Sequence, residues 1–528
     1  MTFNSQTIIQ DVRTDFEEMI DFVKGEEART ATADHIERGL FKMLLALGAK
    51  LLAVFFVMRS EACSRQAIQK GDGQKLPYQR DTRREYFSIF GKVELNRPYF
   101  YQKELGGQIP LDAQLSLGED VYSDLVREIS EYLGVESVYH KTRAILERLL
   151  GLPLSTRVVE ANLAADAVNV EGYYAQKPAP LPGSEAEILV IQADGKGVPM
   201  ILEQPEEEPV RLGKGEKRGH KKEAIVTTLY TIAPKVRTPE EVVASLFKED
   251  TLSMGEKKAL QHIRPQNKHL WATLDGKDIA LERLSQQVER RKGSHIQHQV
   301  ALCDGCEALQ GRIAHQFPDF SLILDFIHAN EYLWDVAISL FGENNPERLG
   351  WMKAHTLQIL SGQTQPVLAE FQALALAKET SNAQRTQLEK TAHYFERNLP
   401  YMDYQTYLAN GWPIASGIIE GACRHFVKDR CELSGMRWSQ TGAENLLRLR
   451  AVAENEDWDA YHAFRREKRH TRLYASPFPG QSTLENQALD SAALPNPPSQ
   501  PLVHPSSSQC PPIRENRQGT YQKLPLAI

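Results

Sequence analysis

Apolar residues recur at helical spacing through the first part of the chain. Between residues 7 and 68 they fall every three or four positions with few glycines or prolines between them, which predicts a mainly helical N-terminal region over residues 1–77. The most apolar stretch, residues 44–58, is shorter than a membrane span and contains Lys50, so we expect it to be a buried helix. Such a helical region is also suited to pairing with a second copy of the chain.

Alternation replaces this pattern between residues 78 and 102, which predicts a β-hairpin that turns at Gly91 and Lys92. Basic and aromatic side chains are interleaved there, a mixture that suits phosphate contact but that a solvated hairpin also shows. The basic residues are Arg80, Arg83, Arg84, Lys92, Arg97 and Lys103. Helical spacing returns from about residue 117 to 150 and again from 157, which fits a helix-turn-helix or an ordinary bundle. Residues 78–175 are therefore a candidate DNA-binding region, followed by a Pro-rich linker.

Short β-branched runs follow, and several end on an aspartate. Residues 188–191 predict a buried strand that leads to Asp194, and the glycines just after it predict a hairpin turn into a second strand over 198–202. Runs at 224–232 and 271–274 predict further strands. The strands at 300–302 and 321–324 lead to Asp304 and Asp325, with helices between and after them.

Carboxylates at strand ends are well placed to hold a divalent cation, because a strand positions oxygen ligands rigidly. A turn aspartate that hydrogen-bonds its own backbone is an equally good interpretation of Asp194. A third carboxylate, Glu420, falls in the first turn of a helix expected from Ile418, which Ser416 is placed to cap. Arg424 and Lys428 follow at i+4 and i+8, so one helix face carries three charges, as a surface salt-bridge ladder also does.

The net charge and the number of cysteines exclude some classes of protein. The net charge of −7 supplies no global basic field, so any nucleic acid must be held by local patches. One such patch is a basic turn, which a mobile solvated loop also resembles; its basic residues are Arg211, Lys214, Lys217, Arg218, Lys221 and Lys222. Six cysteines in 528 residues exclude a disulfide scaffold, and the start of the chain does not resemble a signal peptide, so we expect a cytoplasmic protein.

Two further stretches are interpreted conservatively. The CxxC at Cys303 and Cys306 has no second cysteine pair, which argues against zinc or redox chemistry. Residues 476–528 are rich in Pro, Ser, Gln and Asn, which predicts a disordered tail.

Five stretches taken in order resemble the DDE transposases of insertion sequences, most closely the ISKra4 family. The resemblance runs from about Phe87 to Trp458 and is carried by QADGKGVPM, LCDG, ILDFIHANEYLW, GWPIASGIIEGACR and SGMRWS. It implies an α/β, RNase H-like catalytic domain with a mixed five-stranded sheet over residues 183–328 and 411–470. It also implies that an all-helical insertion, residues 329–410, interrupts this domain.

The same resemblance implies the chemistry. Asp194, Asp304 and Glu420 match the family's catalytic and metal-binding triad, with Asp325 and His328 in supporting positions, and Mg²⁺ as cofactor with Mn²⁺ able to substitute. The implied reaction is cleavage and strand transfer at the ends of the element, on double-stranded DNA of the terminal inverted repeats and the target. Arg424 and Lys428 would hold phosphates, and a homodimer or higher oligomer on DNA is expected. Relatives often carry a cysteine pair near residues 98–112 that is missing here, so we expect no structural zinc.

Two other functions remain open. A catalytically inactive, domesticated transposase would only bind DNA, and loss of a triad residue would favour it. A Mg²⁺-dependent nuclease of the same fold would cleave DNA without forming joined strand-transfer products.

Overall fold

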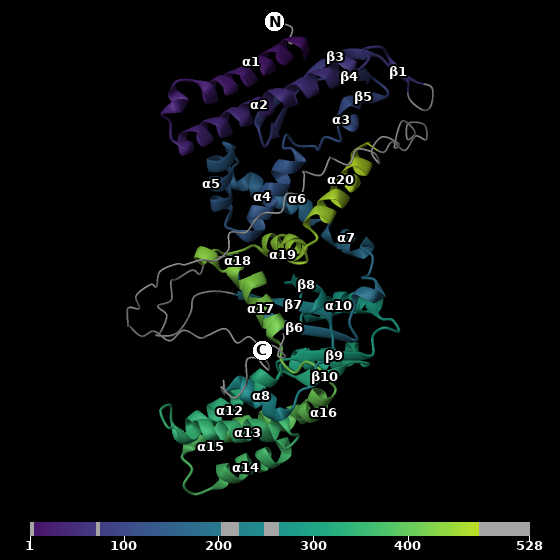
Figure 1. The fold of residues 1–528 in the computed structure, drawn as a ribbon. Coiled ribbons are helices and arrows are strands. Elements are labelled where there is room, and N and C mark those ends of the chain that lie inside the picture. Colours follow the sequence, from purple (N-terminus) through teal and green to yellow (C-terminus); the bar gives the residue numbers. More distant parts are fainter. Residues whose placement is uncertain (1–4, 70–73, 202–220, 248–262, 475–528) are drawn as a thin grey trace, which may run out of the picture. The chain divides into compact units, whose positions relative to one another are not determined.

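The computed structural model describes residues 5–69, 74–201, 221–247 and 263–474 (Figure 1). The chain divides into two compact units, of which one contains residues 1–126 together with the segment from Arg466, and the other contains Arg127–Arg465. The predicted tail, residues 476–528, lies outside the described residues, as do Arg211, Lys214, Lys217 and Arg218 of the basic turn.

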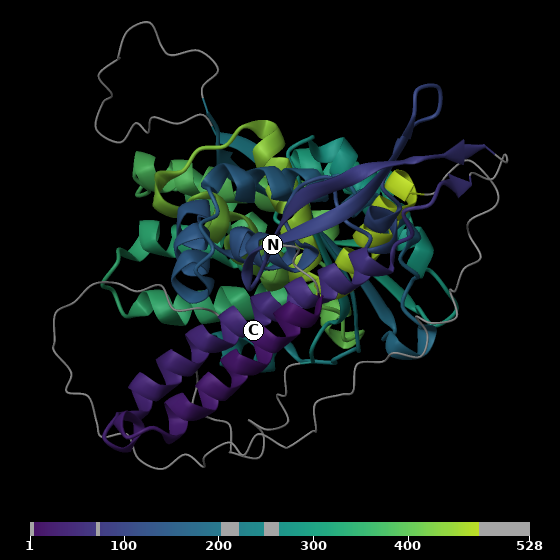
Figure 2. The ribbon, with the colours of Figure 1, turned by 90° about the horizontal axis from the view of Figure 1, so that it is seen from above.

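The first unit begins with an antiparallel pair of helices, α1 (Ser5–Lys24) and α2 (Ala33–Ala62), which confirms the helical N-terminal prediction. Figure 2 shows the two helices side by side, and an ion pair of 2.6 Å between Lys50 and Asp15 joins them. Residues 44–58 lie in a helix, as expected, but the expectation that they are buried is wrong, because α2 has 30 residues and buries only Phe56 and Ser60. By length and composition α2 could cross a membrane, with a mean hydropathy of 2.1 over an 18-residue window of which 6% is buried.

A small sheet follows α2. The predicted hairpin is confirmed as β3 (Tyr78–Ser88) and β4 (Gly91–Gln102), and Gly91 adopts a φ of +105° at the turn. Phe56 of α2 packs on Val93 and Leu95 of β4. The remaining elements of this region are β1 (Ile68–Gln69), β2 (Lys75–Leu76), β5 (Gly106–Gln108) and α3 (Pro110–Gln114).

Half of the basic residues of this hairpin have structural partners. Arg84 and Arg97 both pair with Asp112, at 3.5 and 2.5 Å, and are mostly buried. Lys92 pairs with Glu85 across the two strands. The other three basic side chains are exposed, namely Arg80, Arg83 and Lys103. Phosphate contact by these three stays a prediction.

Helices occupy the next part of the chain, as the apolar spacing predicted. They are α4 (Asp124–Glu136), α5 (Tyr139–Leu150), α6 (Thr156–Ala167) and α7 (Val170–Gln176), so the first begins later than expected from residue 117. Gly151, with a φ of +66°, ends α5, and the hydroxyl of Ser155 accepts a hydrogen bond of 3.2 Å from the Val158 N–H at the start of α6. Whether these helices bind DNA as a helix-turn-helix stays a prediction.

The second unit is built on a mixed five-stranded sheet, which confirms an α/β fold. Its strands lie in the order β10-β9-β6-β7-β8, and only β7 runs antiparallel to its neighbours. The strands are β6 (Ile188–Pro199), β7 (Lys221–Ile232), β8 (Gln266–Thr273), β9 (His298–Cys303) and β10 (Ser321–Leu324), and α8 (Pro239–Leu246) follows β7.

The hairpin expected just after Asp194 is wrong. Strand β6 continues through Gly195 and Gly197 to Pro199 and pairs in register with β7 along its whole length. Neither glycine has a positive φ. A tight turn would have given up the ladder between Asp194 and Pro199, so pairing with β7 outweighs the local turn preference of these glycines.

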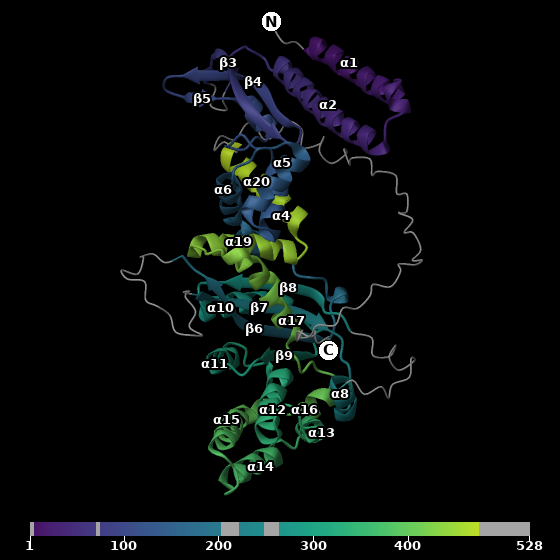
Figure 3. The same ribbon diagram turned by 90° about the vertical axis from the view of Figure 1, so that its left-hand side faces the viewer.

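Helices cover both faces of this sheet, because successive side chains of a strand point to opposite faces. Leu189, Ile191 and Ala193 of β6 pack against α10 (Lys277–Arg291) and α11 (Glu307–Gln316). On the other face, Val198, Ala224 and Val226 pack against the helices of the segment from 417 to 454 (Figure 3). That segment contains α17 (Gly417–Ala422), a π-helix η4 (Cys423–Lys428), α18 (Asp429–Cys431) and α19 (Gln440–Glu454), and α20 (Trp458–Tyr474) follows.

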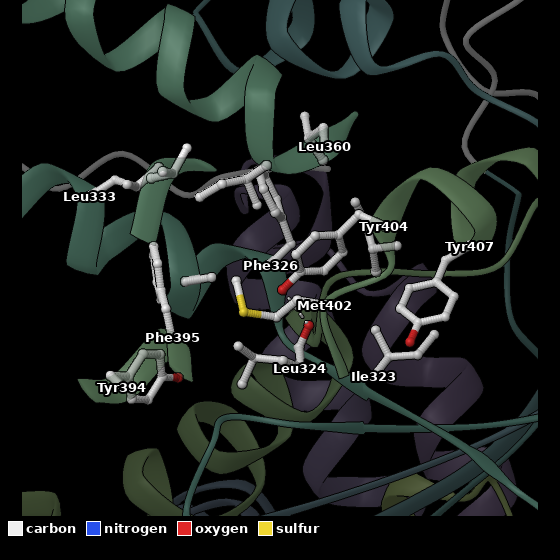
Figure 4. Close-up of a cluster of buried hydrophobic side chains, with 14 of the residues drawn as sticks. Ile323, Leu324, Phe326, Leu333, Leu360, Tyr394, Phe395, Met402, Tyr404 and Tyr407 are labelled. Carbon is white, nitrogen blue, oxygen red and sulfur yellow. Dashed lines mark hydrogen bonds between the residues drawn. The ribbon is translucent and has the colours of Figure 1, made fainter. Parts of the chain in front are cut away.

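Residues 326–409 are helical throughout, in agreement with the predicted helical block. The block contains α12 (Phe326–Phe341), α13 (Glu347–Leu360), α14 (Thr364–Leu376), α15 (Asn382–Asn398) and α16 (Tyr404–Ala409). Its core continues that of the sheet, since Leu324 of β10 lies among Phe326, Met402 and Tyr404 (Figure 4). The Tyr404 hydroxyl donates a hydrogen bond of 3.0 Å to the Leu324 carbonyl. The block is therefore fastened to the end of β10.

Candidate active site

Three aspartates lie beside one another at one edge of the sheet. In the register of the parallel strands, Gln192 of β6 pairs with Leu302 of β9, so Asp194 and Asp304 each follow two residues later. Asp325 follows β10, and its N–H donates a hydrogen bond of 2.8 Å to the carbonyl of Cys303, the last residue of β9. Because the three strands are parallel and in this register, the three side chains lie at the same level of the sheet, with Asp194 inside β6 and the other two just beyond β9 and β10.

Asp194 is partly buried and is held on both oxygens. Its Oδ1 accepts a hydrogen bond of 2.6 Å from the Gly195 N–H, and its Oδ2 accepts one of 3.2 Å from the thiol of Cys423. Burial raises the pKa of Asp194, and the negative charge of Asp304 adds to this, although the bonds from Cys423 and Gly195 act against it. The local backbone bond expected of a turn aspartate is present, but it lies inside a strand.

Asp304 is positioned by its own loop and by the helical block. Its Oδ1 accepts a hydrogen bond of 3.0 Å from the Cys306 N–H, and no hydrogen bond reaches Oδ2 from the described residues. From α15, the Tyr394 hydroxyl donates to the Asp304 carbonyl at 3.0 Å and Arg397 donates to the Gly305 carbonyl at 2.5 Å. Two side chains that lie 90 and 92 positions further along the chain thus fix the backbone that carries this carboxylate.

Glu420 lies in the first turn of α17, as predicted, and its helix is fastened to the sheet. The side-chain oxygen of Gln192, which is fully buried in β6, accepts a hydrogen bond of 3.0 Å from the Ile419 N–H. One residue beyond α17 begins the π-helix η4, whose first residue is Cys423, the residue bonded to Asp194. Burial raises the pKa of Glu420, and the charge of Asp325 adds to this.

Asp325 ties two helices together. Its Oδ1 accepts the N–H groups of Ile327 and His328 at 2.6 and 3.3 Å, so it caps α12. Its Oδ2 accepts the Ser416 N–H at 2.7 Å and also contacts the Ser416 hydroxyl. Burial alone would raise the pKa of Asp325, but bonds from His328 and Ser416 outweigh burial and lower it. The expectation that Ser416 caps α17 is therefore wrong, because its hydroxyl faces Asp325 instead.

His328 is the common neighbour of the acidic groups. Its Nδ1 lies 3.8 Å from Asp325 Oδ2 and 3.9 Å from Glu420 Oε1. Asp325 is the main cause that raises the pKa of His328 to about 9, and the charge of Asp304 contributes. In turn the charge of His328 opposes the rise that burial causes in the pKa of Asp194 and Glu420. His328 therefore lies within 4 Å of two carboxylates and interacts electrostatically with Asp194 and Asp304 as well.

These residues suit a hard divalent cation. Carboxylate oxygens are the ligands that Mg²⁺ prefers, and a cation relieves the cost of partly burying Asp194 close to Asp304. Asp325, His328 and Glu420 offer ligand atoms that all lie within 4.8 Å of one another. Because Asp325 is fully buried and already accepts several hydrogen bonds, we regard Asp194, Asp304 and Glu420 as the better candidates to hold metal.

A second acidic group, Glu131, Asp166 and His462, is fully enclosed and has a different character. Arg127 and Arg465 pair with the two oxygens of Asp166, at 2.8 and 3.0 Å. Two guanidinium groups already balance its carboxylates, so this cluster is an internal ion network of the helices and not a metal centre.

The basic residues predicted to bind DNA have diverse surroundings. Lys221 pairs with Glu432, and Lys222 donates a hydrogen bond of 2.7 Å to Gln440. Arg424 and Lys428 are exposed on η4. No ion pair joins Glu420 to Arg424 in the part of the chain that the structure describes, so the predicted ladder does not form. The π-helix alters the α-helical spacing on which that ladder depended.

Sequence reasoning missed the residues that position the triad. Gln192 and Cys423 were identifiable, since a polar residue inside an apolar strand and a cysteine three positions after Glu420 are both unusual. No local sequence pattern indicates the roles of Tyr394 and Arg397, or the bond from Ser416 to Asp325.

Gly305→Ala is expected to lower the free energy of unfolding by about 1–3 kcal/mol, as for other residues forced into a positive φ. Gly305 has a φ of +85°, and an added Cβ would lie 2.4 Å from the Tyr394 hydroxyl. Gly311→Ala is the control, since this glycine lies in α11 with nothing within 4 Å of the added atom. That change should stabilise by about 0.5–1 kcal/mol. Urea unfolding measures the free energy of unfolding of both variants. Equal changes in the two would contradict the requirement for glycine at position 305.

Asp194, Asp304 and Glu420 are thus candidate ligands for a divalent cation, and the adjoining π-helix carries the exposed side chains of Arg424 and Lys428. No protein-family model matches this chain, and no curated protein matches it either.

Proposed function

We propose that this chain is a DDE-type transposase that binds the ends of its own insertion sequence and catalyses metal-dependent DNA strand cleavage and strand transfer. The observation that carries the proposal is that Asp194, Asp304 and Glu420, from two neighbouring parallel strands and one helix start, all interact electrostatically with His328. When bound there, a pair of Mg²⁺ ions would activate an attacking hydroxyl and stabilise the leaving oxygen of a phosphodiester.

The architecture supports this proposal. A five-stranded sheet in which only β7 is reversed, with helices on both faces, is what an RNase H-like domain requires. The helical block from Phe326 to Ala409 lies between β10 and the helix of Glu420, where the resemblance to ISKra4 transposases expects a helical insertion. In this proposal the block also has a mechanical role, because α15 holds the loop of Asp304.

Each residue then has a defined task. Asp194 and Asp304 hold the cations, and Glu420 completes the ligand set. Asp325 positions Glu420 by fixing Ser416 ahead of α17, and His328 supplies positive charge among the acidic groups. Arg424 and Lys428 contact DNA phosphates of the terminal repeats and the target.

The decisive experiment uses the full chain and a plasmid that carries the DNA flanking its reading frame. With Mg²⁺ or Mn²⁺ we expect new 3′ hydroxyl ends at the element boundary and joined products in target DNA. With Ca²⁺ we expect binding without cleavage, because Ca²⁺ tolerates loose geometry that in-line attack does not. Binding without cleavage in Mg²⁺ would favour the inactive DNA-binding alternative, and cleavage without joining would favour a nuclease.

A further inference from the structure

Helix α2 has one apolar face that the described residues leave open. A second face lies against α1, where Lys50 pairs with Asp15, and a third packs Phe56 on Val93 and Leu95 of β4. The open face carries large side chains that are each about half exposed. They are Phe41 (46%), Leu44 (53%), Leu51 (50%), Phe55 (45%) and Met58 (53%).

The spacing of this face is that of a helix-pairing seam. Together with Gly48, its positions are separated by three, four, three, four and three residues, which is the a/d pattern of a coiled coil. Phe90, from the turn of the β3–β4 hairpin, lies over Gly48, since a Cβ there would be 2.5 Å from its ring. Phe90 is itself 38% exposed, so it fills the gap that the glycine leaves. We call these six side chains, the five of α2 and Phe90, the α2 stripe.

The α2 stripe has nearly the same order of side chains in both chain directions. Phe41 and Phe55 lie seven residues on either side of Gly48, and Leu44 and Leu51 lie four and three residues from it. Two antiparallel copies crossing near Gly48 would therefore place Phe41 against Phe55 and Leu44 against Leu51. This self-complementarity is what a two-fold symmetric interface requires.

Surface area and charge agree with such an interface. At roughly 200 Å² for a large side chain, half exposure of the α2 stripe leaves about 500 Å² of mainly apolar surface, and a stable interface needs about 800 Å² per partner. The adjoining α1 adds Phe16 and Val23, which are 52% and 48% exposed. Antiparallel pairing also sets the acidic first turn of α2, with Asp34, toward the last turn of the other copy, with Arg59.

A lipid bilayer fits these observations less well. A bilayer around α2 would place the partly exposed ion pair of Lys50 and Asp15 in hydrocarbon, where charged side chains are costly. The large apolar side chains that are about half exposed on α2 form a stripe at heptad spacing, which is typical of helix–helix contact.

We propose that the α2 stripe is a homodimer interface, in which two copies of this chain pair α2 with α2 in antiparallel orientation about an axis near Gly48. The interface is remote in sequence from the carboxylate site, and its formation does not depend on DNA or metal.

The test measures the mass of the full chain by light scattering after gel filtration, without DNA, at micromolar concentration. The wild-type chain should have twice the mass of one copy. Leu44→Glu and Leu51→Lys should each give monomers with unchanged circular dichroism and melting temperature, since both side chains are half exposed. Leu376→Glu is the matched control, because Leu376 is 84% exposed in another helix, and it should remain dimeric.

The double variant Leu44→Glu with Leu51→Lys separates antiparallel from parallel pairing. In the antiparallel dimer each Glu faces a Lys of the other copy, so the dimer should return. In a parallel dimer like charges would meet, and the variant would stay monomeric. A monomeric wild-type chain, single variants that remain dimeric, or a monomeric double variant would overturn the proposal, as would a monomeric wild-type chain that floats with phosphatidylcholine–phosphatidylserine vesicles.

Discussion

Asp194→Asn, Asp304→Asn and Glu420→Gln are each expected to lower strand cleavage by about a thousandfold or more, since loss of one metal ligand costs several kcal/mol of transition-state stabilisation. Each substitution removes a ligand charge at nearly constant shape. Because the ligands act as a unit, double and triple substitutions should add little to the first. The measurement is the single-turnover rate of nicking at the element boundary in Mg²⁺.

These three variants should lose DNA cleavage but keep DNA binding. Affinity for terminal-repeat DNA should stay near that of the wild-type chain for all three. Arg424→Glu with Lys428→Glu should instead weaken binding and flatten the slope of log affinity against log salt, because fewer phosphate charges are neutralised. Asp325→Asn and His328→Ala should lose only part of the activity, since Asp325 acts by holding Ser416 and capping α12. A purified Asp194→Asn enzyme that nicks at the wild-type rate would refute the assignment.

Arg450→Leu is expected to be strongly destabilising, by about 3–5 kcal/mol, which is typical of breaking a buried charged network. Arg450 is 5% exposed and donates to the carbonyls of Phe426, His425 and Val135 at 2.6 to 2.8 Å. Leucine would remove the guanidinium donor from each of these carbonyls. Two of them belong to the π-helix η4, which begins at Cys423, so cleavage should fall together with stability.

Arg448→Leu is the matched control for this prediction. Arg448 lies two residues earlier on α19 and is partly exposed, and it makes no hydrogen bond to any described residue. Its replacement should change the free energy of unfolding by less than about 1 kcal/mol, as for most surface substitutions. Urea unfolding of both variants gives the comparison. Similar losses in the two would show that charge on α19, and not the carbonyl bonds of Arg450, stabilises this region.

The dimer and the proposed reaction address the same physical problem. Transposition joins two DNA ends, and a chain with one carboxylate site per copy needs a second copy nearby. The α2 stripe is far from Glu420 in the sequence, and in our proposal it supplies the surface that holds the second copy. The two proposals are nevertheless tested separately, because dimer formation is measured without DNA.

Local patterns in the sequence predicted many of the elements that the structure contains. The helical spacing of α1 and α2, the alternation of β3 and β4 and the apolar runs of β6, β9 and β10 all predicted the elements that the structure contains. The apolar runs correctly placed Asp304 just after a strand, whereas Asp194 lies inside β6 and not at its end. The RNase H-like fold and the catalytic roles stay predictions.

Long-range contacts decided the rest, and these have no local signature. The glycines after Asp194 favoured a turn, but pairing with β7 extended β6 to Pro199. The hydroxyl of Ser416 was expected to cap its own helix and instead contacts Asp325, 91 residues away in sequence. Residues 44–58 were expected to be buried because they are apolar, yet burial depends on what packs against a helix. Each outcome was set by competition between a local preference and a tertiary contact, and only the folded chain reveals which partner is present.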